Sequence, residues 1–359
     1  MRGSVEKRAA NIQLMSSFRE ILETEYPIIQ APMAGVQGSA LAIAVSNAGG
    51  LGSLPCAMLS AEALRSELAA IRAGRDGPYN VNFFCHTPPE PDDAREGAWR
   101  RLLAKYYEEF GIRSPEKGSG GSGRAPFTEE AADVLEEFRP PVVSFHFGLP
   151  SESLMRRVKA MGSKIFASAT TVEEARWLER RGLDAIVAQG WEAGGHRGMF
   201  LTEDLTTQAG TFALVPQVVR AVKVPVIAAG GIADASGVAA AMALGAVAAH
   251  IGTAYLLCPE ATTRPVHREA LRSETGRHTA VTNLFSGRPA RGIVNRIMKE
   301  LGPVNEMVPA FPLAAAALAP LREKAESTRD SGFSALWSGQ NATGCRDIPA
   351  AEITRKLGG

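Results

Sequence analysis

The sequence predicts a closed (β/α)8 barrel with an insertion after the third strand and a helical extension at the C-terminal end. Short apolar runs alternate with amphipathic helical patterns, which is the order of parallel βα units. The runs are apolar throughout, as expected for strands that are buried on both faces. Eight such runs, each followed by a helix, favour a closed TIM barrel over the structural alternative, an open doubly wound sheet.

The predicted strands are short and several end in glycine or proline. Their ranges are 27–33, 50–55, 79–84, 142–148, 164–170, 185–190, 225–231 and 248–256. The helical patterns span 39–49, 59–74, 151–162, 171–182, 211–222, 234–245 and 260–273. Several begin with Ser, Thr or Asp and end on Gly, the residues that cap helix ends. Thr171, for example, is expected to cap a helix with acidic residues in its first turn and arginines in its last.

Two segments fall outside this repeat. The insertion after the third strand should contain a helix at about 92–110 and a mobile surface loop at the GSGGSG tract, 118–123. In the extension, the apolar stretch 313–321 is too short to span a bilayer and is predicted as a buried helix. The predicted units are a barrel, 20–275, which includes the insertion, 85–140, and an extension packed on it, 276–359.

Composition narrows the possible partners and location. The 39 basic and 38 acidic residues nearly cancel, which argues against a nucleic acid or an anionic membrane as partner. The four cysteines lie far apart without a C-x-x-C pair, so neither a disulfide framework nor a metal site is expected. The charged N-terminal segment lacks the apolar core of a secretory signal. We therefore expect a cytoplasmic protein that acts on small molecules.

The ends of the seventh and eighth strands predict a phosphate site. Barrel enzymes commonly bind phosphate in the loops after these strands. Gly230 and Gly231 leave backbone N–H groups open to an anion, and Asp234 can cap the helix that follows. Gly252 and Thr253 supply further amides and a hydroxyl. No G-x-G-x-x-G dinucleotide motif follows the first strand, so a mononucleotide such as FMN suits this single cradle.

Other strand ends could hold a flat ring. The first strand is followed by a corner with a rigid backbone and a polarizable apolar surface, formed by Ala31, Pro32 and Met33. Asn82 and Gln189 carry amides that both donate and accept hydrogen bonds, as the polar edge of an isoalloxazine requires. The alternative is that these amides only satisfy backbone groups at the barrel end.

Histidines at the same edge are the candidates for chemistry. His196 follows Gly194 and Gly195 after the sixth strand, and histidine can take a proton near neutral pH. His146 ends the fourth strand and either lines a substrate cavity or forms a hydrogen bond in the barrel mouth. His86 is a weaker candidate for the same cavity, and the backbone of His250 should matter more than its ring. Glu192 and Arg197 are interpreted as structural partners.

The ordered motifs PIIQAPMAG, SNAGGLGSL, VNFFCHTPP, SFHFGLP, QGWEAGGHRG, AAGGIAD and IGTAYL resemble the nitronate monooxygenase family, formerly called 2-nitropropane dioxygenases. The similarity covers roughly residues 20–345, and VNFFCH, SFHFGLP and EAGGHRG look like its class I branch. The loops at 35–40 and 118–123 depart from the family pattern, and both border the expected cavity.

The resemblance implies FMN as cofactor, His196 as the catalytic histidine and Gln340 near the flavin. Nitronates would be oxidised by O2 through a flavin semiquinone to a carbonyl compound and nitrite, a detoxification of nitroalkanes. The implied cofactor contacts are Met33, Asn82, Gln189, Gly194, Gly195, Gly230, Gly231, His250, Ile251, Gly252 and Thr253.

Two other readings of the motifs remain open. A flavin-dependent enoyl-thioester reductase would share the glycine–histidine loop but would need NAD(P)H. A non-catalytic flavin- or phosphate-binding barrel would bind its ligand without consuming oxygen.

Overall fold

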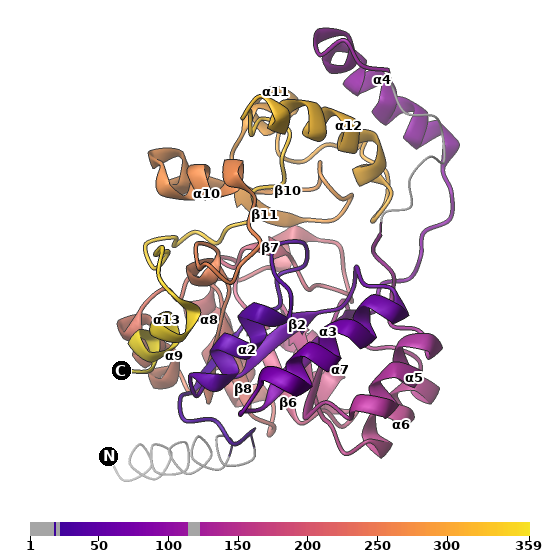
Figure 1. Ribbon diagram of the computed structural model, residues 1–359. Coiled ribbons are helices and arrows are strands. Elements are labelled where there is room, and N and C mark those ends of the chain that lie inside the picture. Colours follow the sequence, from indigo (N-terminus) through magenta and orange to yellow (C-terminus); the bar gives the residue numbers. More distant parts are fainter. Residues whose placement is uncertain (1–17, 19–21, 114–122) are drawn as a thin grey trace.

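Eight parallel strands form the lower part of the molecule in Figure 1, and they close into a barrel. The computed structural model describes residue 18, residues 22–113 and residues 123–359. The strands pair in the order β1-β9-β8-β6-β5-β4-β3-β2, and a parallel bridge between Ile29 and Leu51 joins the two ends of this row. The prediction of a closed (β/α)8 barrel is confirmed.

Each barrel strand lies inside its predicted range. The strands are β1 (Ile28–Gln30), β2 (Gly52–Pro55), β3 (Tyr79–Phe84), β4 (Val142–His146), β5 (Lys164–Ala169), β6 (Ala185–Gln189), β8 (Val226–Ala229) and β9 (Ala248–Ile251). The range predicted for the last strand is too long. Gly252, at φ −112° and ψ −66°, leaves the extended conformation, and the 3-10 turn η2 (Thr253–Tyr255) follows.

The helices around the barrel follow the predicted pattern with one addition. They are α2 (Ser39–Asn47), α3 (Ala61–Gly74), α5 (Glu129–Phe138), α6 (Glu152–Ala160), α7 (Val172–Glu179), α8 (Thr211–Ala221) and α9 (Ala235–Ala243). The side chains of Thr171 and Asp234 accept hydrogen bonds from N–H groups of the helices they precede, so both predicted caps are present. Helix α5 is absent from the sequence prediction because it lies inside the range assigned to the insertion.

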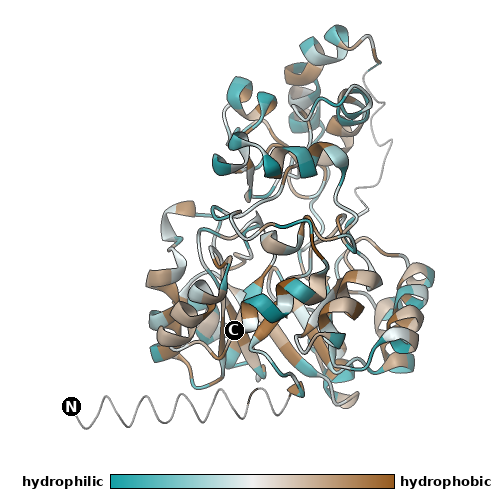
Figure 2. Cartoon of the chain, turned by 60° about the vertical axis from the view of Figure 1, so that its left-hand side comes forward, coloured by the Kyte–Doolittle hydropathy of each residue, from teal (hydrophilic) through white to brown (hydrophobic). Residues whose placement is uncertain are grey.

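Apolar side chains fill the barrel and the space between strands and helices. Figure 2 shows hydrophobic residues concentrated on the barrel strands, and buried helix residues such as Leu68 of α3 belong to one apolar cluster with strand residues. Inside the barrel, Ile29, Phe166, Val187 and Ile227 are buried in one cluster. Because these side chains fill the barrel interior, a ligand site is left to the strand ends.

A second layer covers the carboxyl ends of the strands. This cap layer consists of α4 (Asp93–Glu109) from the insertion together with β10 (Thr279–Thr282), β11 (Ala290–Ile293), α11 (Arg296–Leu301) and α12 (Ala314–Ser327). Strand β11 pairs with β10 and with the short β7 (Gly195–His196), which belongs to the loop after β6. The cap layer therefore makes direct backbone contact with the predicted catalytic loop.

The cap layer has its own apolar core. Trp99 and Tyr106 of α4 are buried with Leu318 and Leu321 of α12 and with Phe333. The helix predicted at about 92–110 is present as α4, and the helix predicted at 313–321 is present as the first part of the longer α12. Helices α10 (Pro265–Arg272) and α13 (Ala350–Gly358) complete the chain, and α13 contacts α2 and α9 on the barrel.

The division at residue 275 stays a prediction. The loop predicted at 118–123 lies, apart from Gly123, outside the described residues. Across the described helices, none combines the length and the apolar character needed to cross a membrane.

Candidate active site

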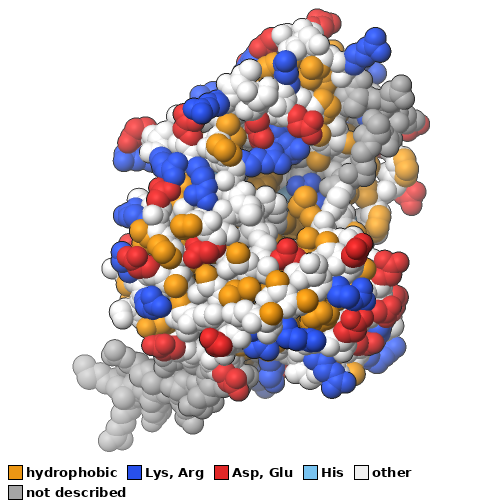
Figure 3. Space-filling model, in the orientation of Figure 1, with side chains coloured by type: hydrophobic (Ala, Val, Ile, Leu, Met, Phe, Trp, Pro, Cys, Tyr) orange, Lys and Arg blue, Asp and Glu red, His pale blue; other side chains and the backbone are white. Residues whose placement is uncertain are grey.

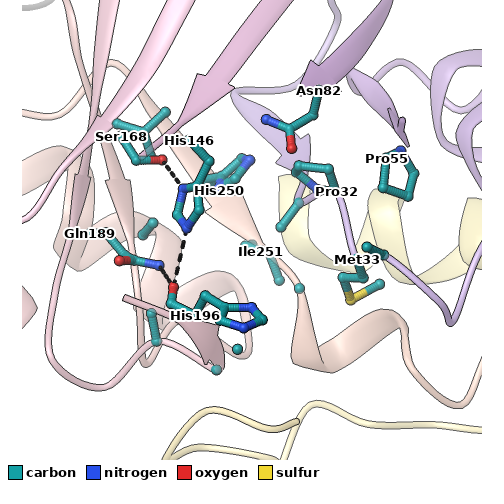
Figure 4. A pocket seen from close by; sticks show the side chains of 18 of the residues that line it. Pro32, Met33, Pro55, Asn82, His146, Ser168, Gln189, His196, His250 and Ile251 are labelled. Carbon is teal, nitrogen blue, oxygen red and sulfur yellow. Dashed lines mark hydrogen bonds between the residues drawn. The ribbon is translucent and has the colours of Figure 1, made fainter. Parts of the chain in front are cut away.

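A pocket opens where the barrel strands end beneath the cap layer (Figure 4). His196 and His146 both line it, whereas His86 does not. The described residues contain no group of His, Cys, Asp or Glu side chains able to hold a metal ion. The residues expected to contact the cofactor all line this pocket: Met33, Asn82, Gln189, Gly194, Gly195, Gly230, Gly231, His250, Ile251, Gly252 and Thr253.

The glycine loops after β8 and β9 form a backbone cradle. Gly230 and Gly231 have φ of +115° and +73°, which L side chains rarely adopt. A Cβ at Gly230 would also lie 2.8 Å from Thr211 Oγ1 and 3.0 Å from the nitrogen of Ala193. Within the described chain, the N–H groups of Gly231 and Gly252 donate to no backbone or side-chain acceptor. These open donors beside the N-terminus of α9 suit an anionic phosphate.

The segment 338–341 holds these loops together from the cap side. The N–H of Gly339 donates to Thr253 Oγ1 at 2.9 Å, and Asn341 Nδ2 donates to the carbonyl oxygen of Gly231 at 3.2 Å. A Cβ at Gly194 would lie 2.5 Å from the nitrogen of Gly339, so only glycine permits this approach. The cradle is therefore assembled from both the barrel and the cap layer.

The corner after β1 is held by buried amides. The N–H of Met33 donates to Gln37 Oε1 at 3.0 Å, and Gln30 Nε2 donates to the same oxygen at 2.7 Å. Gln37 Nε2 in turn donates to the carbonyl oxygen of Ser53 at 2.6 Å. These bonds hold the Met33 backbone, and Met33 Sδ would lie 3.5 Å from a Cβ at Gly252, so an apolar surface adjoins the amide cradle.

Asn82 and Gln189 use their amides differently. Asn82 Nδ2 donates to Ser144 Oγ at 2.9 Å, whereas no hydrogen bond to its Oδ1 is found in the described chain. Gln189 Nε2 donates to the carbonyl oxygen of His196 at 2.9 Å, and its Oε1 accepts the N–H of Gly198 at 2.7 Å. Asn82 thus offers an acceptor to a ligand, and Gln189 mainly braces the loop that carries His196 (Figure 4).

The His196 ring lies in an aromatic enclosure. Ring centroids of Phe311, Trp337 and Phe147 are 5.4, 5.5 and 5.9 Å from it. Its Nε2 is 2.9 Å from Ser286 Oγ in the cap layer. Figure 4 shows the ring on the side of the pocket that faces the Met33 corner. An imidazole fixed in this way can exchange a proton with a ligand in the pocket.

Burial and positive neighbours keep His196 neutral. Burial holds the pKa of its imidazole well below the usual range, and the charges of Arg124 and Arg288 lower it further. His146 and His86 act in the same direction. A neutral imidazole at pH 7 accepts a proton, so we expect His196 to act as a base or hydrogen-bonding group rather than as a standing positive charge.

The other histidines have distinct surroundings. His146 Nε2 lies 3.3 Å from the carbonyl oxygen of His196, so it donates there, and its Nδ1 then accepts from Ser168 Oγ at 3.0 Å. Burial lowers the pKa of His146 to about 3. His86 is buried behind the pocket with its ring centroid 4.8 Å from that of Phe311, and its pKa is lowered to about 4 by burial. His146 therefore supports the His196 loop.

Other pocket residues escaped sequence reasoning. Trp337, His267 and Arg124 line the pocket, although they come from the extension, α10 and the insertion. His267 lies on α10 and is buried, and its Nε2 donates to the carbonyl oxygen of Trp337 at 3.1 Å. The Gln340 side chain is exposed and does not line the pocket.

Arg197 and Glu192 are structural partners, as interpreted from the sequence. Arg197 is fully buried and donates to the carbonyl oxygens of Gly190 and Gln189 at 2.6 and 2.8 Å. The Glu192 carboxylate accepts both the N–H and the hydroxyl of Thr211 at 2.8 Å. Both side chains therefore brace the loop around the pocket.

The fold is that of a TIM-barrel oxidoreductase. The family model described as nitronate monooxygenase matches residues 15–358. The chain belongs to the nitronate monooxygenase family, whose members are flavin-dependent oxidoreductases.

Individual relatives agree with this assignment. A nitronate monooxygenase of Pseudomonas aeruginosa is 43% identical over 95% of this chain and 97% of its own. The solved structure of nitroalkane oxidase from Streptomyces ansochromogenes has a TM-score of 0.85 at 37% identity and covers 95% of this chain and 96% of that one. FabK from Thermotoga maritima is more distant, with a TM-score of 0.70 at 30% identity over 94% of this chain and 93% of its own.

Proposed function

We propose that the protein uses FMN to oxidise alkyl nitronates with molecular oxygen, giving a carbonyl compound and nitrite, and that it acts more slowly on neutral nitroalkanes. The observation that carries this proposal is the combination in one pocket of an amide cradle, an apolar corner and a buried histidine. Each of the three matches one part of the reaction.

The cradle and the corner fit FMN. The open N–H groups of Gly231 and Gly252 would bind its phosphate, and Met33 would lie against its ring. The Oδ1 of Asn82 would accept a ring N–H. A single cradle without a dinucleotide motif favours a mononucleotide. When bound, the flavin supplies the electron-transfer chemistry.

The rest of the pocket fits a small anion. Arg124 lines it, and Arg288 lies close enough to lower the pKa of His196. In the space-filling view, Lys and Arg side chains gather where the cap layer meets the barrel (Figure 3). Positive charge around a partly dry pocket attracts an anionic nitronate, and the aromatic rings around His196 limit the access of water.

A neutral nitroalkane must first lose its α-proton. The neutral imidazole of His196 can take this proton, but Arg124 and Arg288 oppose the positive charge that results. Proton removal therefore carries a penalty that a preformed nitronate avoids. This is the reason why we expect nitronates to be the better substrates.

The proposal is tested with the purified protein. We expect a visible flavin spectrum, release of FMN on denaturation, and oxygen uptake with nitrite formation when a nitronate is added. NADH should not bleach the flavin rapidly. Rapid bleaching with turnover of an enoyl thioester would favour the reductase instead, and bound flavin without oxygen uptake would favour a non-catalytic barrel.

Removing the charge of Arg124 should change the pH dependence. Activity on a neutral nitroalkane needs unprotonated His196, so it falls as the pH drops through the pKa of this imidazole. Because Arg124 lowers that pKa, Arg124→Gln should raise it towards 6.5, and the acid limb of kcat/KM should move to higher pH. The acid limb is measured from initial rates at a series of pH values, with nitroalkane dissolved just before use so that it is still in the neutral form.

The matched control is Arg156→Gln, which removes an exposed arginine on α6. It should leave the acid limb where it is in the unmodified protein. If Arg124→Gln shifts the limb to lower pH, or not at all, the charge does not act on His196 as described.

A further inference from the structure

Ser286 lies in the turn between β10 and β11 and is only 1% exposed. The turn is held by the N–H of Gly287, which donates to the carbonyl oxygen of Asn283 at 2.8 Å. Gly287 has a φ of +91°, and a Cβ there would lie 2.2 Å from the carbonyl oxygen of Pro309. The position of Ser286 is therefore fixed by its own turn and by the packing of this turn against the segment around Pro309.

The same hairpin also holds the main chain of His196. Ala290 of β11 is the register partner of His196, and the N–H of Arg197 donates to the carbonyl oxygen of Pro289 at 2.8 Å. Ser286 Oγ then meets the imidazole at Nε2, 2.9 Å away. One hairpin thus fixes both the backbone and the ring of the proposed base.

Hydrogen-bond counting gives the direction of the Ser286–His196 contact. Ser286 Oγ is 3.3 Å from the carbonyl oxygen of Arg288, which can only accept, and the N–H of Arg288 donates to Ser286 Oγ at 3.4 Å. If the hydroxyl donates to this carbonyl, Oγ can also accept the Nε2 proton of His196, and all three bonds form. If the hydroxyl instead donates to Nε2, the bond to the Arg288 carbonyl is lost.

We infer that Ser286 is a positioning residue that holds His196 in the tautomer protonated at Nε2, so that Nδ1 is the atom that takes the α-proton of a neutral nitroalkane. This inference rests on the proposed function. In that step the C–H bond breaks, its electron pair stays with the substrate as the nitronate, and the proton binds Nδ1. The resulting imidazolium keeps donating its Nε2 proton to Ser286.

The tautomer can be read directly by nitrogen NMR. In holoenzyme with 15N-labelled histidine, the His196 resonances are assigned by comparison with His196→Asn. In the unmodified protein we expect Nδ1 to have the 15N chemical shift of an unprotonated nitrogen and Nε2 that of a protonated one. In Ser286→Ala we expect a mixture of the two tautomers. A wild-type protein protonated at Nδ1 would overturn the inference. This reading needs no turnover, so it stands apart from any failure of the proposed function.

Kinetics give the second readout. Ser286→Ala should lower kcat/KM for a neutral nitroalkane by about 10- to 100-fold, the range expected for losing a hydrogen bond to a cation. Turnover of the preformed nitronate and flavin content should change little. Ser286→Thr retains the hydroxyl and should restore most of the loss. Equal losses on both substrates would contradict the assignment.

The matched control is Ser334→Ala. Ser334 is buried in the same part of the molecule and donates to Glu326, away from the pocket. It should leave the ratio of the two activities unchanged. If it lowers that ratio as much as Ser286→Ala does, loss of a buried hydroxyl in general explains the effect, and the inference falls.

Discussion

His196→Asn is expected to lower turnover of a neutral nitroalkane by about 10²–10⁴-fold, the usual contribution of a general base. The loss on a preformed nitronate should be far smaller, because that substrate has already lost its proton. Asparagine retains hydrogen-bonding capacity at this position, so the change mainly removes the ability to bind the α-proton. Oxygen uptake with each form of the same nitro compound measures the two losses.

The control for this experiment is His278→Asn, which alters an exposed histidine next to β10. It should affect neither activity. Equal losses on both substrates after His196→Asn would discard the base role and leave His196 as a binding residue.

The sequence alone could place those site residues that lie at or just after the end of a barrel strand. A parallel strand places its last residues at one edge of the barrel, so Asn82, Gln189 and the glycines at 230–231 could be assigned to a common site from their order alone. His196 could be placed there as well, since it closely follows a strand. Local order was sufficient for these residues.

Residues brought in from distant segments could not be placed in this way. Ser286 meets His196, which lies 90 positions away in the chain, because β11 pairs with β7. Arg124 reaches the pocket because the N–H of Ala125 donates to the carbonyl oxygen of Ala57 at 3.1 Å and anchors its backbone. Such contacts depend on tertiary pairing and leave no periodic signal in the sequence.

Local pattern misled where backbone conformation decided the outcome. The apolar run at 248–256 has strand character, but the backbone at Gly252 ends the strand. The Gln189 amide bonds at both ends to the His196–Gly198 loop, and its predicted contact with a flavin edge stays a prediction. A residue type shows which bonds are possible, and only the fold decides which of them form.

The second large effect is expected from Gly252→Asp, which should weaken FMN binding by roughly a hundredfold to a thousandfold. Gly252 has a φ of −112°, so a side chain adds no strain of the left-handed kind. Its Cβ would make ordinary contacts, 3.4 Å from the Cβ of Ala31 and 3.5 Å from Met33 Sδ. The carboxylate would add a negative charge beside the N–H group that is proposed to bind the phosphate, and two like charges about 4 Å apart repel by about 4 kcal/mol at an effective dielectric of about 20.

Gly252→Asn separates the effect of charge from that of size, because the asparagine side chain has nearly the same shape as aspartate but carries no charge. Titration of flavin-free protein with FMN, followed by flavin fluorescence, gives the dissociation constant of each variant. The asparagine variant should stay within about tenfold of the unmodified protein, since about 1.4 kcal/mol corresponds to a factor of ten. If the two variants lose equal affinity, bulk rather than charge is responsible. If neither loses affinity, the phosphate is bound elsewhere.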